Sequence, residues 1–395
     1  MQGVSTTGSV ANNLERFRRA ATLPLCLSVS FALAGCADLG YYLQSAQGHF
    51  GVMQAARPVD AWLGEPAAPP GLKSQLELAQ RIRRFAVTEL ALPDNPSYTR
   101  YADIQRSAVV WNVVAAPEFS LTLKTWCFPV AGCVGYRGYF EEAGARALAA
   151  ELKSQGLEVS VYSVPAYSTL GWMNWMGGDP LLNTFIHYPE AELARLLFHE
   201  LAHQVAYAKN DTMFNESFAT AVERLGGNRW IEQYSSEGVK RLFNANSERR
   251  QQFRALTQAT RRALSSLYGS ASEPSHGAAD KAELKKAAME RFRAGYAGLR
   301  ARWQAASDTP LNLAGYDAWV ANANNASFGA QAAYDELVPQ FEALFYKNAA
   351  QSRQQSPLQS PWPAFYDAVR QLARLPENER RKSLADQTFS TPIDK

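Results

Sequence analysis

The chain has 395 residues, of which 47% are apolar and 19% charged, with a formal net charge of +3. It is too apolar for a disordered chain and too long for a small disulfide-stapled scaffold, so it holds one large domain or two packed ones. The first 35 residues contain three Arg and one Glu, which leaves 37 basic and 36 acidic side chains in the remainder. This balance offers no basic footprint, and we expect no nucleic-acid partner.

Residues 1–35 have the pattern of a secretory signal. Arg16, Arg18 and Arg19 precede an apolar run over 20–33 that is too short to span a membrane. The run leads into Leu33-Ala-Gly-Cys36, which resembles the bacterial lipobox, whose Cys is acylated and becomes the mature N-terminus. We therefore predict a lipoprotein signal peptide over 1–35 and a membrane anchor on Cys36. The alternative is an ordinary signal with a coincidental Cys.

This anchor would place the protein in the bacterial cell envelope, facing the periplasm. Ala37 follows the Cys, where Asp usually signals inner-membrane retention, so the outer membrane is favoured. Residues 36–70 are rich in Gly, Pro and Ala and are predicted to be a tether. Residues 71–375 form the predicted domain, and residues 376–395 a loose tail.

Hydrophobic periodicity predicts a helix over 72–90, one or two strands over 108–125, a helix over 140–155 and a strand over 157–164. A helix is expected from Pro189 to about 209, and another over 215–225, where Gly226-Gly227 stops it. Further helices are expected over 236–267, 279–306, 328–349 and 362–374. The predicted fold class is α+β, mainly α, with a small β-sheet in the N-terminal half and a helical part from about residue 236.

Cys127 and Cys133 are the two cysteines outside the signal and lipobox, six positions apart around a Pro/Gly turn. An exported protein meets an oxidising compartment, so the pair is expected to form a disulfide. Two free thiols are the alternative. A zinc knuckle would need further ligands close by, and the sequence has none there.

The string His199-Glu200-Leu-Ala-His203 is the candidate catalytic motif. On a helix, residues at i and i+4 lie on one face, so both imidazoles can bind one zinc ion while Glu200 lies beside it as a general base. A catalytic zinc wants a third protein ligand, and Glu216 follows in Asn215-Glu216. Glu223 lies two turns further along the same face and is assigned to orient a ligand imidazole.

The His-Glu-x-x-His and Asn-Glu strings look like those of the gluzincin metallopeptidases, which include thermolysin-like enzymes and zinc aminopeptidases. The resemblance implies a zincin-like fold and one Zn²⁺ bound by His199, His203 and the Glu of Asn-Glu. The twelve-residue spacer between His203 and Glu216 is shorter than those families use. This leaves the choice between Glu216 and Glu223 open.

The chain more closely resembles a bacterial family of aminopeptidase lipoproteins. The matching strings lie at Leu33–Cys36, Trp126–Phe140, Pro165–Trp172, Asp179–Asn183, Phe198–Gln204, Asp211–Ala219 and Asn324–Ala326. This resemblance implies a zinc-dependent peptidase, in particular an aminopeptidase, that hydrolyses peptide bonds with a zinc-activated water and Glu200 as the base. Two alternatives stay open: a non-catalytic envelope lipoprotein that binds a partner on the same scaffold, or a zinc amidase acting on a non-peptide substrate.

Other residues are weaker candidates. Tyr334 could donate a hydrogen bond to the oxyanion, although packing on an amphipathic helix is the commoner role of such a residue. Tyr167 and Asp179 could line the cleft, and the strand over 157–164 could be the edge on which a peptide is laid out. Trp126, Trp172 and Trp175 are expected in the core.

Overall fold

The computed structural model describes residues 39–128, 132–269, 278–356 and 358–386. These residues divide into two units, with the boundary between Gln54 and Ala55. One helix makes up the described part of the first unit, starting at residue 39 and ending at residue 55, the first residue of the second unit. The predicted signal peptide and Cys36 lie outside the described residues. Among the helices of the described ranges, none is long and apolar enough to cross a bilayer.

The second unit begins with a small mixed sheet. Strand β2 (Arg100–Ala102) lies between β1 (Arg57–Pro58), which is antiparallel to it, and β8 (Leu181–Leu182), which is parallel. Helices α2 (Val59–Gly64) and α3 (Pro70–Thr88) complete this region. The predicted tether over 36–70 therefore holds helices and a sheet strand, because β1 pairs with residues more than forty positions away.

The main sheet has β3 (Val110–Pro117) at its centre, with β6 (Arg137–Tyr139) and β7 (Leu157–Val164) antiparallel on either side. Val113 and Ala115 face α4 (Glu142–Ser154), while Val114 and Ala116 pack against Ala326 on the opposite face. Both faces of β3 are thus buried, which explains why it is apolar at every position except Asn112. Strand β7 forms one edge of this sheet.

Strands β4 (Trp126–Phe128) and β5 (Gly132–Val134) form a separate hairpin. A disulfide joins Cys127 to Cys133, which face each other across the two strands. The backbone N–H of Cys133 donates to the Asn210 side chain at 2.7 Å, so the hairpin is tied to the loop that follows the predicted zinc motif.

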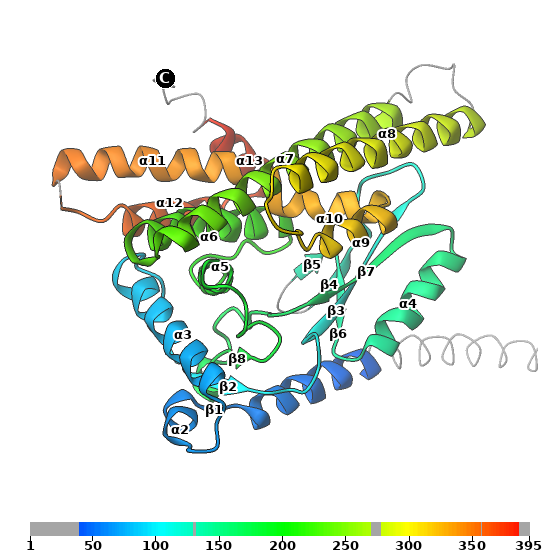
Figure 1. Ribbon diagram of the computed structural model, residues 1–395. Coiled ribbons are helices and arrows are strands. Elements are labelled where there is room, and N and C mark those ends of the chain that lie inside the picture. Colours follow the sequence, from blue (N-terminus) through cyan, green and yellow to red (C-terminus); the bar gives the residue numbers. More distant parts are fainter. Residues whose placement is uncertain (1–38, 129–131, 270–277, 357, 387–395) are drawn as a thin grey trace, which may run out of the picture. The chain divides into compact units, whose positions relative to one another are not determined.

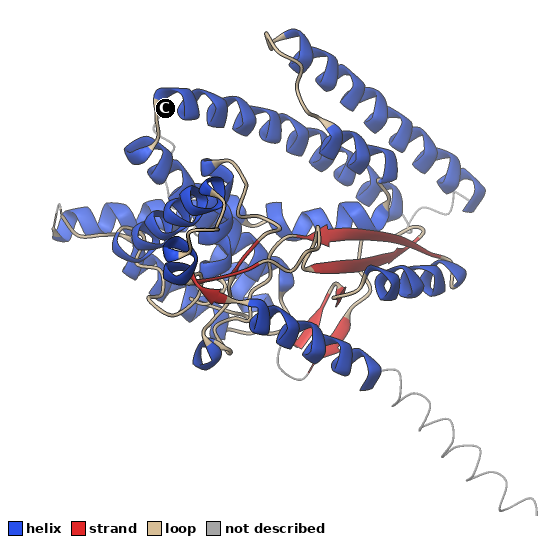
Figure 2. Ribbon diagram, turned by 60° about the horizontal axis from the view of Figure 1, so that its bottom comes forward, coloured by secondary structure: helices blue, strands red, loops and turns tan. Residues whose placement is uncertain are grey.

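From residue 190 onward the described chain is helical, as Figures 1 and 2 show. The mainly α character expected from the sequence is confirmed. The elements are α5 (Glu190–Ala202), α6 (Thr212–Tyr234), α7 (Glu237–Gly269), α8 (Ala278–Ala305), α9 (Ala314–Asn322), α10 (Asn325–Asp335), α11 (Val338–Gln355), α12 (Trp362–Arg374) and α13 (Glu377–Ala385).

Helix α6 lies at the centre of this part and packs against α5, α10 and α11. Phe85 of α3 contacts Phe198 of α5 and Trp230 of α6, with ring centroids 5.8 and 5.2 Å apart. Phe218 on α6 meets Phe341 and Phe365 of α11 and α12. Aromatic packing on both sides therefore holds α6 in place against α5.

Several predicted boundaries were wrong. Helix α5 ends at Ala202, not near residue 209, and α6 runs straight through Gly226 and Gly227. A Cβ on Gly226 would lie 2.6 Å from Leu90 and 3.1 Å from Phe198, so the glycines permit close helix packing and do not end the helix. The predicted helix over 328–349 is two helices, α10 and α11.

The loose tail expected over 376–395 was also wrong for its first part. Residues 377–385 form α13, and Arg380 on that helix is buried. Its guanidinium bonds to Asp211, which caps the start of α6. Residues 387–395 lie outside the described residues.

Candidate metal centre

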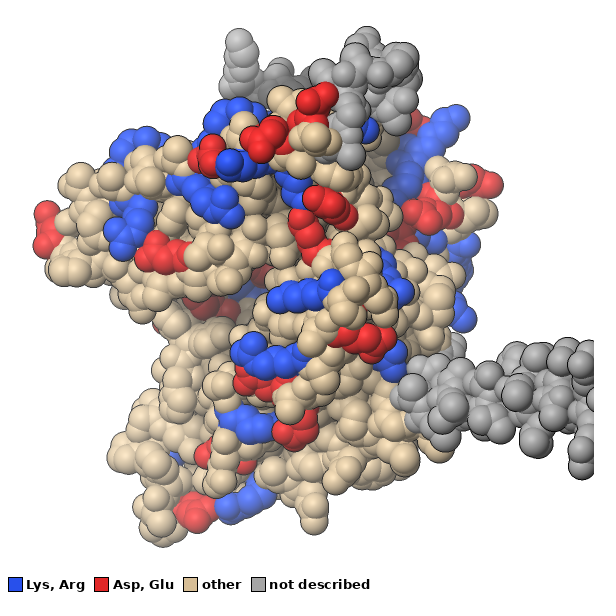
Figure 3. Space-filling view, turned by 90° about the vertical axis from the view of Figure 1, so that its right-hand side faces the viewer, with Lys and Arg blue, Asp and Glu red and all other residues tan. Residues whose placement is uncertain are grey.

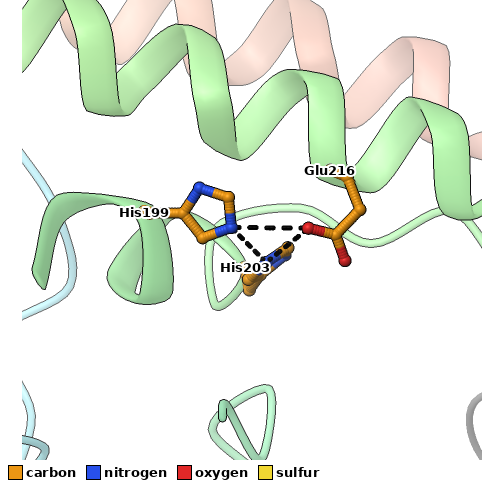
Figure 4. A group of neighbouring side chains, drawn as sticks. All are labelled: His199, His203 and Glu216. Carbon is orange, nitrogen blue, oxygen red and sulfur yellow. Dashed lines mark hydrogen bonds and ion pairs between the residues drawn. The ribbon is translucent and has the colours of Figure 1, made fainter. Parts of the chain in front are cut away.

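His199, His203 and Glu216 form a buried group whose ligand atoms all lie within 4.8 Å of one another. The two Nε2 atoms are 3.2 Å apart, and Glu216 Oε2 lies 3.4 Å from His199 Nε2 and 3.6 Å from His203 Nε2 (Figure 4). Donor atoms around a tetrahedral ion with bonds of about 2.0–2.1 Å are about 3.3 Å apart. The three atoms thus match one face of such a tetrahedron, and this group could hold a metal ion.

The two histidines come from the last turn of α5 and its cap. His199 lies inside the helix, and His203 is the C-cap residue with helical dihedral angles. The i, i+4 spacing therefore still brings both rings to one side, with centroids 4.9 Å apart. Buried leucines on the same helix, Leu193, Leu197 and Leu201, fix the rotation of α5.

Asn215 explains how a short spacer can bring Glu216 to the histidines. Its side-chain oxygen accepts the Ala208 N–H at 2.7 Å, and its amide donates to the Ala208 carbonyl at 2.9 Å. This pair of bonds closes the loop between α5 and α6 from inside. Asp211 accepts the Phe214 N–H at 3.0 Å and so caps α6 just before Glu216.

Glu223 lies on the far side of His199 from Glu216. Its Oε2 is 3.1 Å from His199 Nδ1, and its other oxygen bonds to Arg195. Burial by itself would raise the pKa of Glu223, but Arg195 and then the His199 hydrogen bond lower it to about 2. Glu223 is thus an ionised acceptor that orients the His199 ring and leaves Nε2 turned toward Glu216.

The ionisable groups of the cluster interact strongly with one another. Burial alone would lower the pKa of His199, but hydrogen bonds to Glu216 and Glu223 raise it to about 10. Burial would likewise raise the pKa of Glu216, and the two imidazoles lower it well below its usual range. The Nδ1 atom of His203 is buried without a hydrogen-bond partner among the described residues. In the metal-free protein the imidazoles and the carboxylates therefore stabilise each other's charged forms.

Glu200 is buried beside the ligand group and does not belong to it. Burial raises its pKa above the ordinary value, opposed by the neighbouring His199 and His203. With His199, Glu223 and Tyr334 it lines a pocket of about 320 Å³. A carboxylate that faces this pocket beside the ligand group can exchange a proton with a molecule bound there.

Tyr334 comes from α10, more than 130 residues after the histidines, and its ring stacks on His199 at 6.2 Å with an interplanar angle of 21°. Burial and the charge of Glu216 raise its pKa well above 10, so the hydroxyl stays a neutral donor. The next residue, Asp335, pairs with Arg224 at 2.9 Å and Arg254 at 3.7 Å. These ion pairs hold the end of α10 against the pocket.

Sequence reasoning missed several residues of the site. Tyr136 and Tyr162 interact electrostatically with Glu216, and Tyr162 lines the same pocket as Tyr334. Residue spacing did not mark them, because Tyr136 reaches the site from the turn between β5 and β6, and Tyr162 from β7. Arg195 could have been noticed, since it lies one turn before His199 on the same helix face.

The edge strand β7 leads into this pocket, and Tyr162, Val164 and Ala166 line it. The Val159 carbonyl accepts a hydrogen bond from the side chain of Asn324, the N-cap of α10, on the outer side of the strand. The Val164 carbonyl instead accepts from Val109, on the β3 side. Since such groups alternate along an antiparallel strand, the backbone of Val161 and Ser163 points away from β3.

The remaining candidates lie elsewhere. Asp179 is buried and accepts the Thr169 N–H and the Gln204 amide, so it holds the loop after β7 in shape. Trp172 and Trp175 on this loop are 66% and 79% exposed, and the expectation that they belong to the core was wrong. The loop is held by polar hydrogen bonds and by glycines at positive φ, so the indoles do not supply its stability.

Residues 40–384 match the model of a family described as "Putative aminopeptidase". No curated protein and no solved structure matches the chain. The matched range includes α5 and α6 with the whole ligand group, and also β7 and α10, which complete the pocket. Because the match covers most of the sequence, the chain belongs to this "Putative aminopeptidase" family.

Proposed function

We propose that the protein is a zinc-dependent peptidase with one Zn²⁺ held by His199, His203 and Glu216. The observation that carries the proposal is the ligand triangle, with edges of 3.2–3.6 Å, beside the buried Glu200. Two imidazoles and one carboxylate form a ligand set typical of catalytic zinc with one open position. The fold that positions them would be a variant of the zincin scaffold.

The chain's own residues have distinct tasks in this proposal. Zn²⁺, when bound, supplies a Lewis acid and lowers the pKa of coordinated water toward about 7. Glu200 takes the proton from the attacking water and returns it to the leaving amine. Tyr334 donates a hydrogen bond to the oxyanion, and the support for this role is its ring, which stacks on His199 and lines the same pocket as Glu200.

The substrate is proposed to be a peptide in extended conformation along β7. The outward backbone groups of Val161 and Ser163 could pair with a peptide strand, which would then pass the pocket that Glu200 lines. The family to which the chain belongs supports a free α-amine as the group recognised, and hence an aminopeptidase.

A peptide library tests this function directly. Zinc-loaded protein should hydrolyse peptides with a free N-terminus and leave N-acetylated peptides largely intact. Cleavage of both sets would indicate an endopeptidase. Cleavage of non-peptide amides alone would favour an amidase, and binding without any hydrolysis would favour a scaffold protein.

The variant Glu200→Gln separates the base from the metal ligands. It should retain stoichiometric zinc, because it removes no ligand, and lose about 10²–10⁴-fold in kcat. Zinc content by elemental analysis and turnover on the best library peptide measure the two effects. Full activity in this variant would mean that Glu200 is not the base.

We also propose that Cys36 is acylated and anchors the protein in the cell envelope, facing the periplasm from the outer membrane. The support is the Leu33-Ala-Gly-Cys36 string after a basic and apolar segment. Metabolic labelling with a fatty acid should mark the wild type and not Cys36→Ser. Equal labelling of the two would contradict the anchor.

A further inference from the structure

The helix over residues 39–55 exposes a stripe of large apolar side chains. Leu39, Tyr42, Leu43 and Phe50 are exposed at 59%, 42%, 61% and 58%. At about 100° per residue, these positions and Ala46 fall within one arc about 100° wide. An apolar stripe of this width on one side of a helix is the usual sign of a surface that packs against something.

The same helix carries no charged side chain. Between residues 39 and 56 there is no Asp, Glu, Lys or Arg, while the chain as a whole is 19% charged. A helix built to face water would carry such residues on its exposed positions. The partner of this stripe must therefore accept an uncharged apolar surface, and ionic attraction contributes little to the contact.

The position of the helix in the chain identifies its partner. Leu39 follows the proposed acylation site, Cys36, by three residues. Three residues span at most about 11 Å, so an acyl group in the bilayer would keep the first turn of the helix at the membrane surface. Tyrosine, phenylalanine and leucine are also suited to the boundary between headgroups and acyl chains.

We propose that this helix lies in the plane of the membrane, with the stripe Leu39, Tyr42, Leu43, Ala46 and Phe50 inserted at the boundary of headgroups and acyl chains. The inference builds on the proposed anchor at Cys36 and is independent of the peptidase chemistry. The helix acts as a second attachment beside the acyl chains, and the lipid it recognises is an uncharged bilayer surface.

Vesicle flotation tests the proposal without lipidation. The chain from residue 36 onward, with Cys36→Ser, keeps every described residue and should float with vesicles of neutral phosphatidylcholine. The bound fraction should be the same at low and high salt, because no charge takes part. Binding that needs anionic lipid and disappears at high salt would overturn the proposal.

A stripe variant and a matched control locate the contact. The triple variant Leu39→Gln, Leu43→Gln and Phe50→Gln should lower the vesicle affinity by about tenfold or more. Gln47→Ser with Gln54→Ser, at exposed positions outside the stripe, should leave it unchanged. Equal binding by the triple variant would refute the assignment. Circular dichroism establishes that each variant is folded.

Sedimentation without vesicles separates the lipid surface from a second copy of the chain. The proposal expects the parent and the triple variant to have the same mass. If the parent is a dimer and the triple variant a monomer that binds vesicles equally well, the stripe is a protein interface. Flotation requires neither zinc nor hydrolysis, so its failure is distinct from failure of the proposed peptidase function.

Discussion

At the scale of single residues, Glu216 and Glu223 have different positions around one imidazole. Glu216 approaches His199 Nε2 at 3.4 Å, whereas Glu223 approaches Nδ1 at 3.1 Å from the other side. The Nε2 atom of His203 lies on the same side as Glu216, so a metal ion bound there would take Glu216 as its ligand. Glu223 would then be the acceptor that orients the ring.

Zinc affinity should separate the two carboxylates. Glu216→Ala removes a ligand, so the affinity measured by chelator competition should fall severely. Glu223→Ala should weaken it by about 10–100-fold, because the ring loses its orienting partner and keeps its metal-binding nitrogen. The reverse order of effects would make Glu223 the ligand.

The stability of the metal-free protein should depend on Glu223 in a defined pH window. Its folded pKa of about 2 lies below the ordinary 4.5, so its contribution is present above pH 4.5 and lost as the pH falls toward 2. Wild type should therefore exceed Glu223→Gln in free energy of unfolding at pH 7, and the difference should shrink through this window. Urea unfolding in the presence of chelator measures it. A difference that is constant with pH would show that ionisation of Glu223 does not contribute.

At the scale of elements, the contact between α5 and α6 depends on two glycines. Gly226 approaches Phe198 of α5, and Gly227 approaches Arg195, where a Cβ would lie 2.7 Å from Cγ. These contacts allow Arg195 to reach Glu223, and through it His199. Glycine has a lower helix propensity than alanine, so its presence at both positions is unfavourable for the helix itself. The close approach of α5 to α6, which only glycine allows, outweighs this cost.

Alanine substitutions at glycines can compare the cost of a steric overlap with the gain in helix propensity. Gly226→Ala gains about 1 kcal/mol in helix propensity but creates an overlap with Leu90, so we expect a net loss of about 1–2 kcal/mol. Gly298→Ala on α8 meets only the end of Arg302, at 3.5 Å, and should stabilise by about 0.5–1 kcal/mol. Urea unfolding compares the two. Stabilisation of both variants would show that the contact at Gly226 is not tight.

At the scale of the whole second unit, distant segments complete the site. Strand β7 lies at the pocket edge, α5 and α6 carry the ligand group, and α10 carries Tyr334. Helix α13, near the end of the chain, returns to Asp211 at the start of α6. On the face that Figure 3 shows, Lys and Arg are interspersed with Asp and Glu, as the near-balanced charge of the sequence leads one to expect.

Substitution of two neighbouring arginines on α13 tests how much this helix contributes to the stability of the protein. Arg380 and Asp211 form a buried pair with side-chain exposures of 5% and 2%, while Arg381 is 28% exposed. Arg380→Met should lower the free energy of unfolding by about 3 kcal/mol or more, because it leaves a buried carboxylate poorly paired. Arg381→Met is the control and should cost about 1 kcal/mol or less. Equal small losses in thermal or urea unfolding would mean that α13 does not secure α6.

The local elements were predictable where they depend on neighbours in sequence. The strand over 157–164 matches β7 residue for residue, and the helix over 72–90 matches α3 within two residues. The His199, Glu200 and His203 arrangement was predictable for the same reason, since residues four apart share a helix face. The end of α5 and the passage of α6 through its glycines were not, because they depend on contacts with other elements.

The amino-acid sequence by itself determined the mainly helical composition, the metal-ligand spacing of the histidines and the family. Each of these can be recognised from hydrophobic periodicity or from a short motif, because local backbone geometry alone links such patterns to structure. Only the tertiary structure decided that Glu216 and Glu223 lie on opposite sides of His199, and that Tyr162 and Tyr334 meet at one pocket. These relations depend on how β7, α5, α6 and α10 pack together. Such packing is set by contacts between residues far apart in the sequence, such as Glu158 and Asn325, which are 167 positions apart, so no local pattern can predict it.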